Sequence, residues 1–258
     1  MRAHCFLFLV PLLVSLVGCA QGLDRRSLER SLAESQPVLE VTDDEIGRAL
    51  ALRPQLELPA RIGIHFEPYE PDDRSGKVDR EWTLRDKDAI LSAAKELRAS
   101  GFASDVFMIA DSAIPVSDPA NRLRSLRLAA ARHGADALLV IRGAVQVDEY
   151  VNALSIFYPT LVGMLLPGSH CDALFLVEGT LWDVRNQYLY MTEEADGQVE
   201  TIRPLPMVHP EARVADARLK ALEAFRERLL ERWHDLQSRA TLRQGFTYAT
   251  EPDIRAAR

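Results

Sequence analysis

The sequence predicts an α/β protein in which helices pack on a mixed β-sheet of about five to six strands. The expected order is β-α-β-α-β-β-β-α, after an N-terminal signal and a tether. Three observations indicate this fold. Short apolar runs alternate with helical patterns in the first half of the chain. Two long strand-like runs with turn residues follow, and a long amphipathic helix comes last.

The chain begins with a secretory signal at residues 1–18. Arg2 supplies a positive charge, and the apolar run from Cys5 to Val17 is too short to cross a bilayer as a helix. It ends in Leu16-Val17-Gly18-Cys19, which resembles the bacterial lipobox. The resemblance implies cleavage between Gly18 and Cys19, with diacylglycerol and N-acyl lipid, commonly palmitate, on Cys19. Three acyl chains hold a protein to a membrane almost irreversibly. An ordinary signal with an incidental cysteine is the alternative.

Residues 19–59 are predicted to form a lipidated tether with short helices. Thr42 and Glu45 have the spacing of a capping box at the start of one helix. Pro54 and Pro59 prevent further helix. A tether of this length would let the folded domain stand off the membrane.

A single domain is expected over residues 60–240. Ile62, Ile64 and Phe66 alternate with other residues and predict a half-buried strand. Thr83 is expected to cap a helix that runs to Gly101, followed by a buried strand at Val106–Ala110.

A second helix should start at Asp118-Pro119 and end at Gly134. The most clearly predicted strand then starts at Ala137 and continues to Asp148.

The second half of the domain is expected to be antiparallel. A strand at residues 172–184 leads to a turn at Arg185-Asn186, where Asn186 can take a left-handed conformation. The chain returns over 187–194, and Asp196-Gly197 predicts a second hairpin into 198–202. A long helix at about 211–238 has apolar residues three and four apart, and a polar tail follows at 241–258.

Composition restricts the partners. The chain has 31 basic and 38 acidic residues, which argues against nucleic acid or an anionic lipid surface as the ligand. With Cys5 in the signal and Cys19 lipidated, Cys171 has no intramolecular disulfide partner. The histidines and cysteines lack metal-site spacing, so neither a metal nor a soluble cofactor is expected.

The stretch from Gly168 to Asp172 places Ser169, His170 and Cys171 side by side. Catalysis needs a nucleophile and a base that converge in space, whereas neighbours in an extended chain point to alternate faces. We therefore expect a loop that enters a strand, and no catalytic residue is assigned. An enzyme with an unfamiliar site is a minor alternative.

The segment from Val151 to Pro167 contains no charged residue and joins two strands. The favoured interpretation is a buried crossover. The other is a surface for a partner protein or the membrane, since large exposed apolar patches usually have a role. The candidate contact residues are Ile156, Phe157, Tyr158, Leu161, Val162, Met164 and Leu165.

Four segments resemble the rhombotarget lipoprotein family of small bacterial lipoproteins: Leu58–Ile64, Gly134–Val140, Tyr158–Gly168 and Leu181–Val184. This resemblance implies a fold but no established activity. The β-α-β-α-β order also looks like the periplasmic domains of the curli secretion lipoprotein and of the outer-membrane activators of penicillin-binding proteins. Those families imply binding and assembly roles rather than catalysis.

The sequence therefore predicts a lipid-anchored cell-envelope protein that binds or assembles with an envelope protein partner. Ala20 stands where an aspartate usually retains lipoproteins in the inner membrane, so the outer membrane, facing the periplasm, is favoured. The alternative is a subunit of a multimeric envelope or secretion complex that uses segment 151–167 for self-association or membrane contact.

Overall fold

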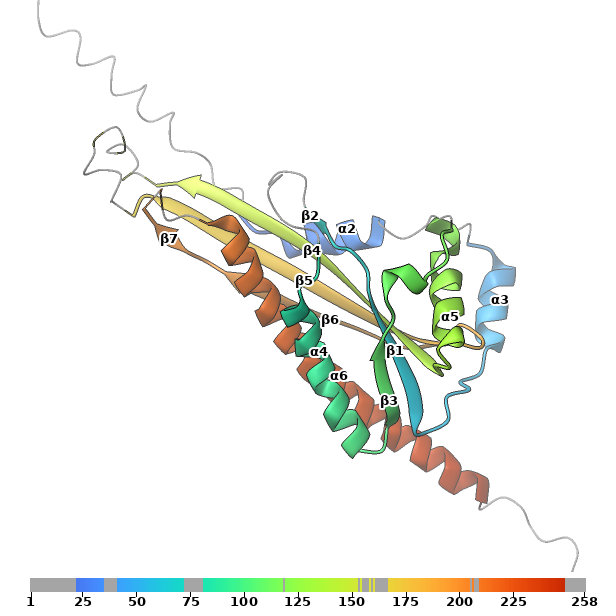
Figure 1. The fold of residues 1–258 in the computed structure, drawn as a ribbon. Coiled ribbons are helices and arrows are strands. Elements are labelled where there is room, and N and C mark those ends of the chain that lie inside the picture. Colours follow the sequence, from blue (N-terminus) through green and yellow to red (C-terminus); the bar gives the residue numbers. More distant parts are fainter. Residues whose placement is uncertain are drawn as a thin grey trace, which may run out of the picture.

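The structure is a computed structural model in which one twisted sheet carries helices on both faces (Figure 1). It describes residues 22–34, 41–71, 81–117, 119–152, 154, 158, 160, 167–204, 206 and 209–248. The predicted signal and Cys19 lie outside these residues.

The sheet has the strand order β3-β1-β4-β5-β6. Strand β1 (Ala60–Phe66) pairs in parallel with β3 (Ala103–Met108) and with β4 (Ala137–Val151). Strands β5 (Ser169–Asp183) and β6 (Leu189–Val199) continue the sheet in antiparallel pairing. Two short strands, β2 (Glu70–Pro71) and β7 (Ile202–Arg203), pair with β4 and β5. The predicted mixed sheet and element order are confirmed.

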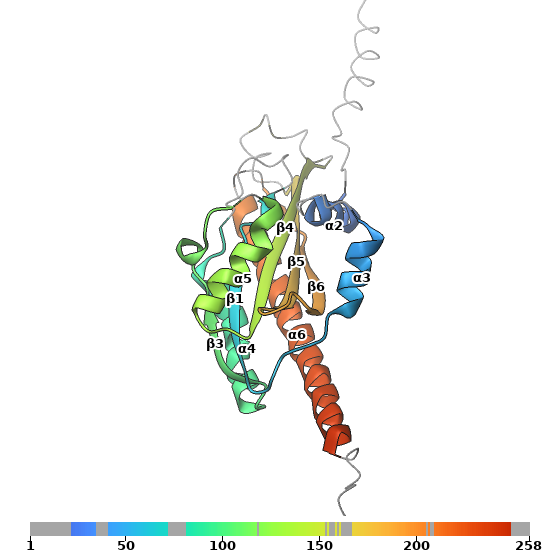
Figure 2. The same ribbon diagram turned by 90° about the vertical axis from the view of Figure 1, so that its right-hand side faces the viewer.

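Helices cover both faces of the sheet. Helices α4 (Leu84–Ala99) and α6 (Pro210–Tyr248) share the largest core cluster, which includes Ile62, Phe175 and Phe225. Helix α5 (Arg122–Arg132) packs Leu126 on Leu138 of the opposite face. Helix α2 (Arg25–Glu34) packs on that same face farther along β4. Figure 2 shows α5 and α2 on the near side of the strands, with α4 and α6 beyond them.

The two faces explain why β1 is more buried than its alternating pattern predicted. Ile62, Ile64 and Phe66 face the α4–α6 side, as expected. Gly63 and His65 are buried as well. A Cβ atom on Gly63 would lie 2.7 Å from the Ile109 side chain, so the second face is also tightly covered. The half-buried prediction for β1 was wrong because parallel strands are covered on both sides.

The predicted helix starts are largely confirmed. Thr83 and Asp86 form a capping box at the start of α4. A 3-10 turn at Pro119–Asn121 precedes α5, so the regular helix begins later than the Asp118-Pro119 signal suggested. Gly134 has φ 69° and follows the end of α5, as predicted.

The predicted second hairpin at Asp196-Gly197 is wrong. Strand β6 runs through both residues and pairs continuously with β5 there. Gly197 lies under α6, where a Cβ would come within 2.2 Å of the Ala217 carbonyl oxygen. Glycine is therefore needed for a close approach of helix and strand rather than for a turn. In the preceding β5–β6 turn, Gln187 rather than Asn186 takes the left-handed conformation, with φ 65°.

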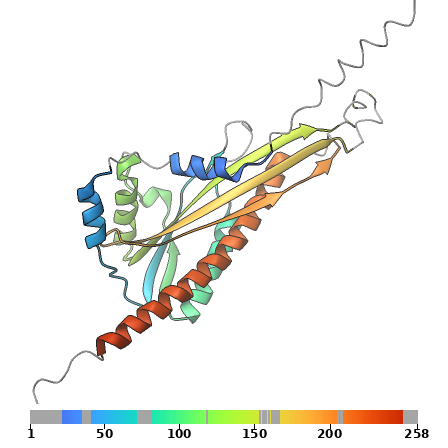
Figure 3. The same cartoon turned by 180° about the vertical axis from the view of Figure 1, so that it is seen from behind.

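Helix α6 extends to Tyr248, beyond the predicted end at Ser238 and into the predicted polar tail. Figure 3 shows its C-terminal end extending past the strands. The buried positions Leu222, Phe225, Leu229 and Trp233 confirm the predicted apolar stripe.

Helix α3 (Asp43–Ala51) has the predicted Thr42–Glu45 capping box and buries none of its residues. By contrast, α2 buries Leu28 and Leu32 against β4 and β5. Part of the predicted tether is therefore packed on the sheet.

Candidate functional site

Polar contacts hold the segment just after the predicted lipidation site against the sheet. The Gly22 amide donates to Asp148 Oδ2 at 2.9 Å, and the Asp24 amide donates to Gln146 Oε1 at 2.8 Å. Arg25 forms ion pairs with Glu194 and Asp196 of β6. Together with buried Leu28 and Leu32, these contacts join α2 to three strands.

The carboxyl end of α2 is fixed as well. Arg142 Nη1 donates to the Leu32 carbonyl at 3.4 Å. The same guanidinium donates to both oxygens of Glu178 at 3.0 Å. Both bonds come from Arg142 Nη2, and both side chains are only 15% exposed, so this ion pair is well shielded from water. Helix α2 is therefore held at both ends.

We call the end of the sheet beyond Gly22 the tip and define it by Tyr150, Leu154, Tyr158, His170 and Ile202. The rings of Tyr150 and His170 stack with centroids 4.5 Å apart. The Tyr158 and Ser169 hydroxyls share a hydrogen bond of 2.7 Å. Leu154 is 40% exposed and Ile202, opposite His170, is 55% exposed. Aromatic and aliphatic side chains thus reach solvent at the tip.

The stretch Ser169–Asp172 forms the first residues of β5 rather than a loop. Ser169 and Cys171 are buried, while His170 and Asp172 are half-buried. His170 is hydrogen-bonded to the Asn152 side chain. Asp172 accepts hydrogen bonds from the Tyr150 hydroxyl and the Thr201 amide. Burial raises the pKa of Cys171 to about 11, with Glu149 and Asp172 adding to the shift. The thiol is therefore protonated at neutral pH and unreactive. The three candidate groups alternate between faces and do not form a catalytic group.

His65 is fully buried where the parallel strands β1 and β3 end. Its Nδ1 donates to the Ile109 carbonyl at 3.3 Å, and its Nε2 accepts from Arg122 Nη2 at 3.3 Å. Arg122 Nε also donates to Glu67 at 2.9 Å. Burial is the main cause that lowers the pKa of His65. The neutral ring fits both partners, because a protonated Nε2 would oppose the guanidinium.

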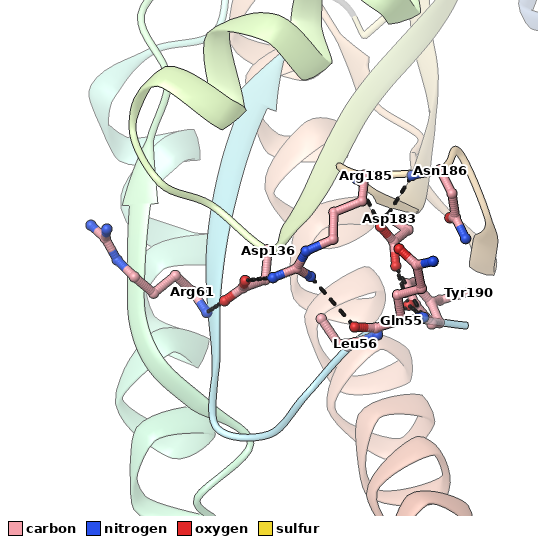
Figure 4. A network of polar contacts seen from close by, with 8 residues as sticks. All are labelled: Gln55, Leu56, Arg61, Asp136, Asp183, Arg185, Asn186 and Tyr190. Carbon is pink, nitrogen blue, oxygen red and sulfur yellow. Dashed lines mark hydrogen bonds and ion pairs between the residues drawn. The ribbon is translucent and has the colours of Figure 1, made fainter. Parts of the chain in front are cut away.

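A second polar cluster, the Asp183 network, joins residues 53–56 to the β5–β6 turn (Figure 4). The Tyr190 hydroxyl donates to Asp183 Oδ2 at 2.6 Å and accepts from the Leu56 amide at 2.8 Å. Burial, followed by the hydrogen bond to Asp183, raises the pKa of Tyr190.

Arg185 extends the Asp183 network across the end of β4. Its Nη2 donates to Asp136 Oδ1 at 2.7 Å, while the Arg61 amide donates to Asp136 Oδ2 at 2.9 Å. Asp136 lies in the Gly134–Val140 segment that carries the family resemblance. Its role here is structural, because it ties β1 to the β5–β6 turn.

A buried ion pair connects α4 and α6. Arg218 lies 3.0 Å from the Asp86 carboxylate, and its Nη1 donates to the Tyr69 hydroxyl at 2.7 Å. Asp86 also completes the Thr83 capping box. Because all of these groups are engaged in packing contacts, we assign them a structural role.

Of the predicted site residues, only Tyr158 lies among the described residues, and it contacts Ser169 at the tip. Gly18, Cys19, Ile156, Phe157, Leu161, Val162, Met164 and Leu165 lie outside them. Within the described ranges, no cluster of three or more potential ligands could hold a metal ion. Nor does any helix there have the length and apolar character needed to span a bilayer.

No protein-family model matches the chain, and no curated protein does. Several solved structures are similar to the chain at low identity. A neuraminyllactose-binding hemagglutinin homolog from Helicobacter pylori is 11% identical with a TM-score of 0.40, covering 70% of this chain and 91% of that one. Lipoprotein GNA1162 from Neisseria meningitidis is 15% identical with a TM-score of 0.31, covering 55% and 85%. The LpoB C-terminal domain from Salmonella enterica is 9% identical with a TM-score of 0.30, covering 57% and 87%.

These TM-scores are all below 0.5, so the similarities do not establish a function. The resemblance to the rhombotarget lipoprotein family stays a prediction.

The contacts that hold α2 were not predicted from the sequence. Arg25 and its partners Glu194 and Asp196 are separated by 169 and 171 positions. Gly22 and Asp148 are separated by 126 positions. No local pattern joins residues so far apart, and α2 has only two buried leucines to mark its inner face.

Proposed function

We propose that the chain is a lipid-anchored cell-envelope protein that binds a protein partner in the periplasm and has no catalytic activity. The observation that supports the anchor most directly is the sequence Leu16-Val17-Gly18-Cys19 behind a short apolar signal. The membrane we favour is the outer membrane, because Ala20 follows the cysteine. Diacylglycerol and N-acyl lipid on Cys19 would be the only attached groups.

The chemistry of the described residues supports a binding role. Ser169 is hydrogen-bonded and buried, Cys171 is buried with a raised pKa, and His65 is enclosed by Arg122 and Ile109. Each of these three groups is therefore engaged in packing contacts. A partner protein, by contrast, needs only an exposed surface.

Cys19→Ala tests the anchor. The thiol is the only group at this position that can accept the diacylglyceryl chain, so the variant should accumulate as precursor and incorporate no lipid. Metabolic labelling with a fatty-acid analogue measures this. Equal labelling of variant and wild type would contradict the proposal.

Crosslinking in intact cells then tests the binding role. An envelope protein should be crosslinked by the wild type, and this crosslink should be lost with Cys19→Ala, because the precursor lacks the lipid that would place the chain at the outer membrane. If the wild type and the Cys19→Ala variant crosslink the same envelope protein, binding of that partner does not require the lipid anchor.

A multimeric envelope subunit is the second candidate, favoured by the exposed apolar residues Leu154 and Ile202 at the tip. It requires self-association, whereas the first candidate does not. Size-exclusion chromatography of the lipid-free protein distinguishes them, since a monomer excludes tip-mediated assembly.

A further inference from the structure

The distance between the lipid and the domain is set by very few residues. Only three peptide steps separate Cys19 from Gly22, whose amide is bonded to Asp148 of β4. An extended chain advances at most about 3.6 Å per residue, so Gly22 lies within roughly 11 Å of the lipidated cysteine. This contradicts a long stand-off tether for any state in which α2 is docked.

The docking of α2 gives the anchor a defined position on the fold. Gly22 lies over Asp148, near the end of β4, while Leu32 at the other end of α2 lies at Arg142 in the middle of the strand. The amino end of α2 therefore points toward the tip. The ion pairs of Arg25 and the burial of Leu28 hold it there.

The opposite end of the sheet is far from this point. Ile202 pairs with His170 at the tip, and Leu189 pairs with Trp182 at the other end of β5. At about 3.4 Å per residue, these two positions on β5 are roughly 40 Å apart. A membrane that holds Cys19 can thus touch the tip but cannot touch Leu189 in the same orientation.

The composition of the tip suits a lipid interface. Tyr150 and Tyr158 have amphipathic rings, which prefer the headgroup region, and Leu154 and Ile202 expose aliphatic carbon. The surrounding charges are mixed but mainly acidic, with Asp148, Glu149, Asp172 and Glu200 against Arg203 and Arg213. Contact would therefore be driven by apolar burial rather than by attraction to anionic lipid.

We propose that α2 fixes the orientation of the domain on its membrane, with the tip in contact with the bilayer that carries the Cys19 lipid. This rests on the proposed lipid anchor. Because Glu149 and Asp172 would repel anionic headgroups, the contact is with the zwitterionic or neutral part of the lipid surface. The far end, at Leu189 and the Asp183 network, then faces away from the membrane.

Short-range fluorescence quenching tests this orientation. The full-length lipidated protein is labelled at Ile202→Cys or at Leu189→Cys and reconstituted in phosphatidylcholine vesicles that contain a headgroup nitroxide. Both positions are exposed aliphatic residues on strands, with Ile202 55% and Leu189 42% exposed. Cys171 is buried with a pKa of about 11, so the label should react at the introduced thiol. We expect quenching about two-fold or more at Ile202→Cys, and little at Leu189→Cys.

A matched pair of helix variants tests the role of α2. In the Ile202→Cys protein, Arg25→Ala removes the ion pairs with β6, while Arg30→Ala removes an equal charge from an exposed position of the same helix. We expect quenching to fall toward the Leu189→Cys value with Arg25→Ala and to stay unchanged with Arg30→Ala. Circular dichroism verifies that both variants are folded.

The outcomes separate this inference from the anchor. Vesicle-bound protein with equal quenching at both labels would overturn the orientation and leave the anchor intact. Equal quenching in the Arg25→Ala and Arg30→Ala proteins would overturn the role assigned to the Arg25 ion pairs in fixing α2. Failure of the wild type to float with vesicles would overturn the proposed anchor itself.

Discussion

Buried polar side chains in this protein occur in groups whose partners come from distant parts of the chain. His65 lies between the Ile109 carbonyl and Arg122, and Asp183 lies between Tyr190 and the amides of Gln55 and Arg185. A buried group without a partner would cost roughly 1–3 kcal/mol, so each group depends on its neighbours. The sequence does not show the pairing of His65 with its two partners or of Asp183 with Gln55, because these contacts depend on the folded sheet.

His65 should make the protein less stable in mild acid. Its pKa is lowered in the folded state, mainly by burial, so between that value and about 6.5 only the unfolded chain binds the proton. Stability is therefore fully present above pH 6.5 and falls as the pH drops, by at most about 1.4 kcal/mol per pH unit for one proton.

Urea unfolding at pH 7.5 and 5.5 measures this. The loss on acidification should be smaller for His65→Gln than for the wild type. His234→Gln changes an exposed histidine of α6 and should behave like the wild type. An unchanged pH dependence in His65→Gln would show that other groups cause the acid sensitivity.

Elements with a strong local period were predicted well, and those decided by tertiary packing were not. The capping box at Thr83 and the stripe through Leu222 and Trp233 are local signals, and both are confirmed. Gly197 is a residue for which the local sequence pattern predicted the wrong structure. Asp-Gly favours a turn, yet here glycine admits α6 against β6, and only the three-dimensional contact distinguishes the two uses.

Of the candidate site, the lipid on Cys19 stays a prediction from the sequence, whereas the docking of α2 on the sheet was not predicted. The lipobox is a contiguous motif, whereas the docking of α2 depends on Asp148, Glu194 and Asp196 of the sheet. The charged sequence of α2 suggested a solvated tether, and its two inner leucines were too few to predict packing.

Gly197→Ala should destabilise the fold. The new methyl group would lie within 2.5 Å of the Ala221 amide nitrogen and closer still to the Ala217 carbonyl, and a helix backbone cannot yield as a flexible side chain can. Overpacking of this kind costs about 1–3 kcal/mol. Thermal unfolding should show a lower midpoint.

Gly47→Ala is the control for this prediction. Gly47 lies in α3 with no atom within 4 Å of its would-be Cβ, so alanine meets no obstacle there and improves helix propensity. Its midpoint should not fall. Equal losses in the two variants would argue against close packing of α6 on Gly197.

Across the whole molecule, the sheet separates two groups of packed helices. Helices α4 and α6 fill one core cluster, while α2 closes a smaller cluster on the other face with Ala144, Leu174 and Leu176. If α2 is part of the folded unit, both faces must unfold together in one transition. A loosely attached tether would instead detach before the domain unfolds.

Leu28→Ala and Leu222→Ala distinguish these two cases. Each removes buried carbon from its own cluster, which costs about 2–5 kcal/mol for leucine in a packed core. Because the two residues belong to separate clusters, we expect their losses to add within about 0.5 kcal/mol in the double variant. Leu50→Ala, at an exposed position of α3, should leave the denaturant midpoint unchanged.

A Leu28→Ala protein that unfolds like the wild type, while Leu222→Ala is clearly destabilised, would mean that α2 contributes no stability to the domain. The orientation proposed for the membrane-bound protein would then lose its physical basis.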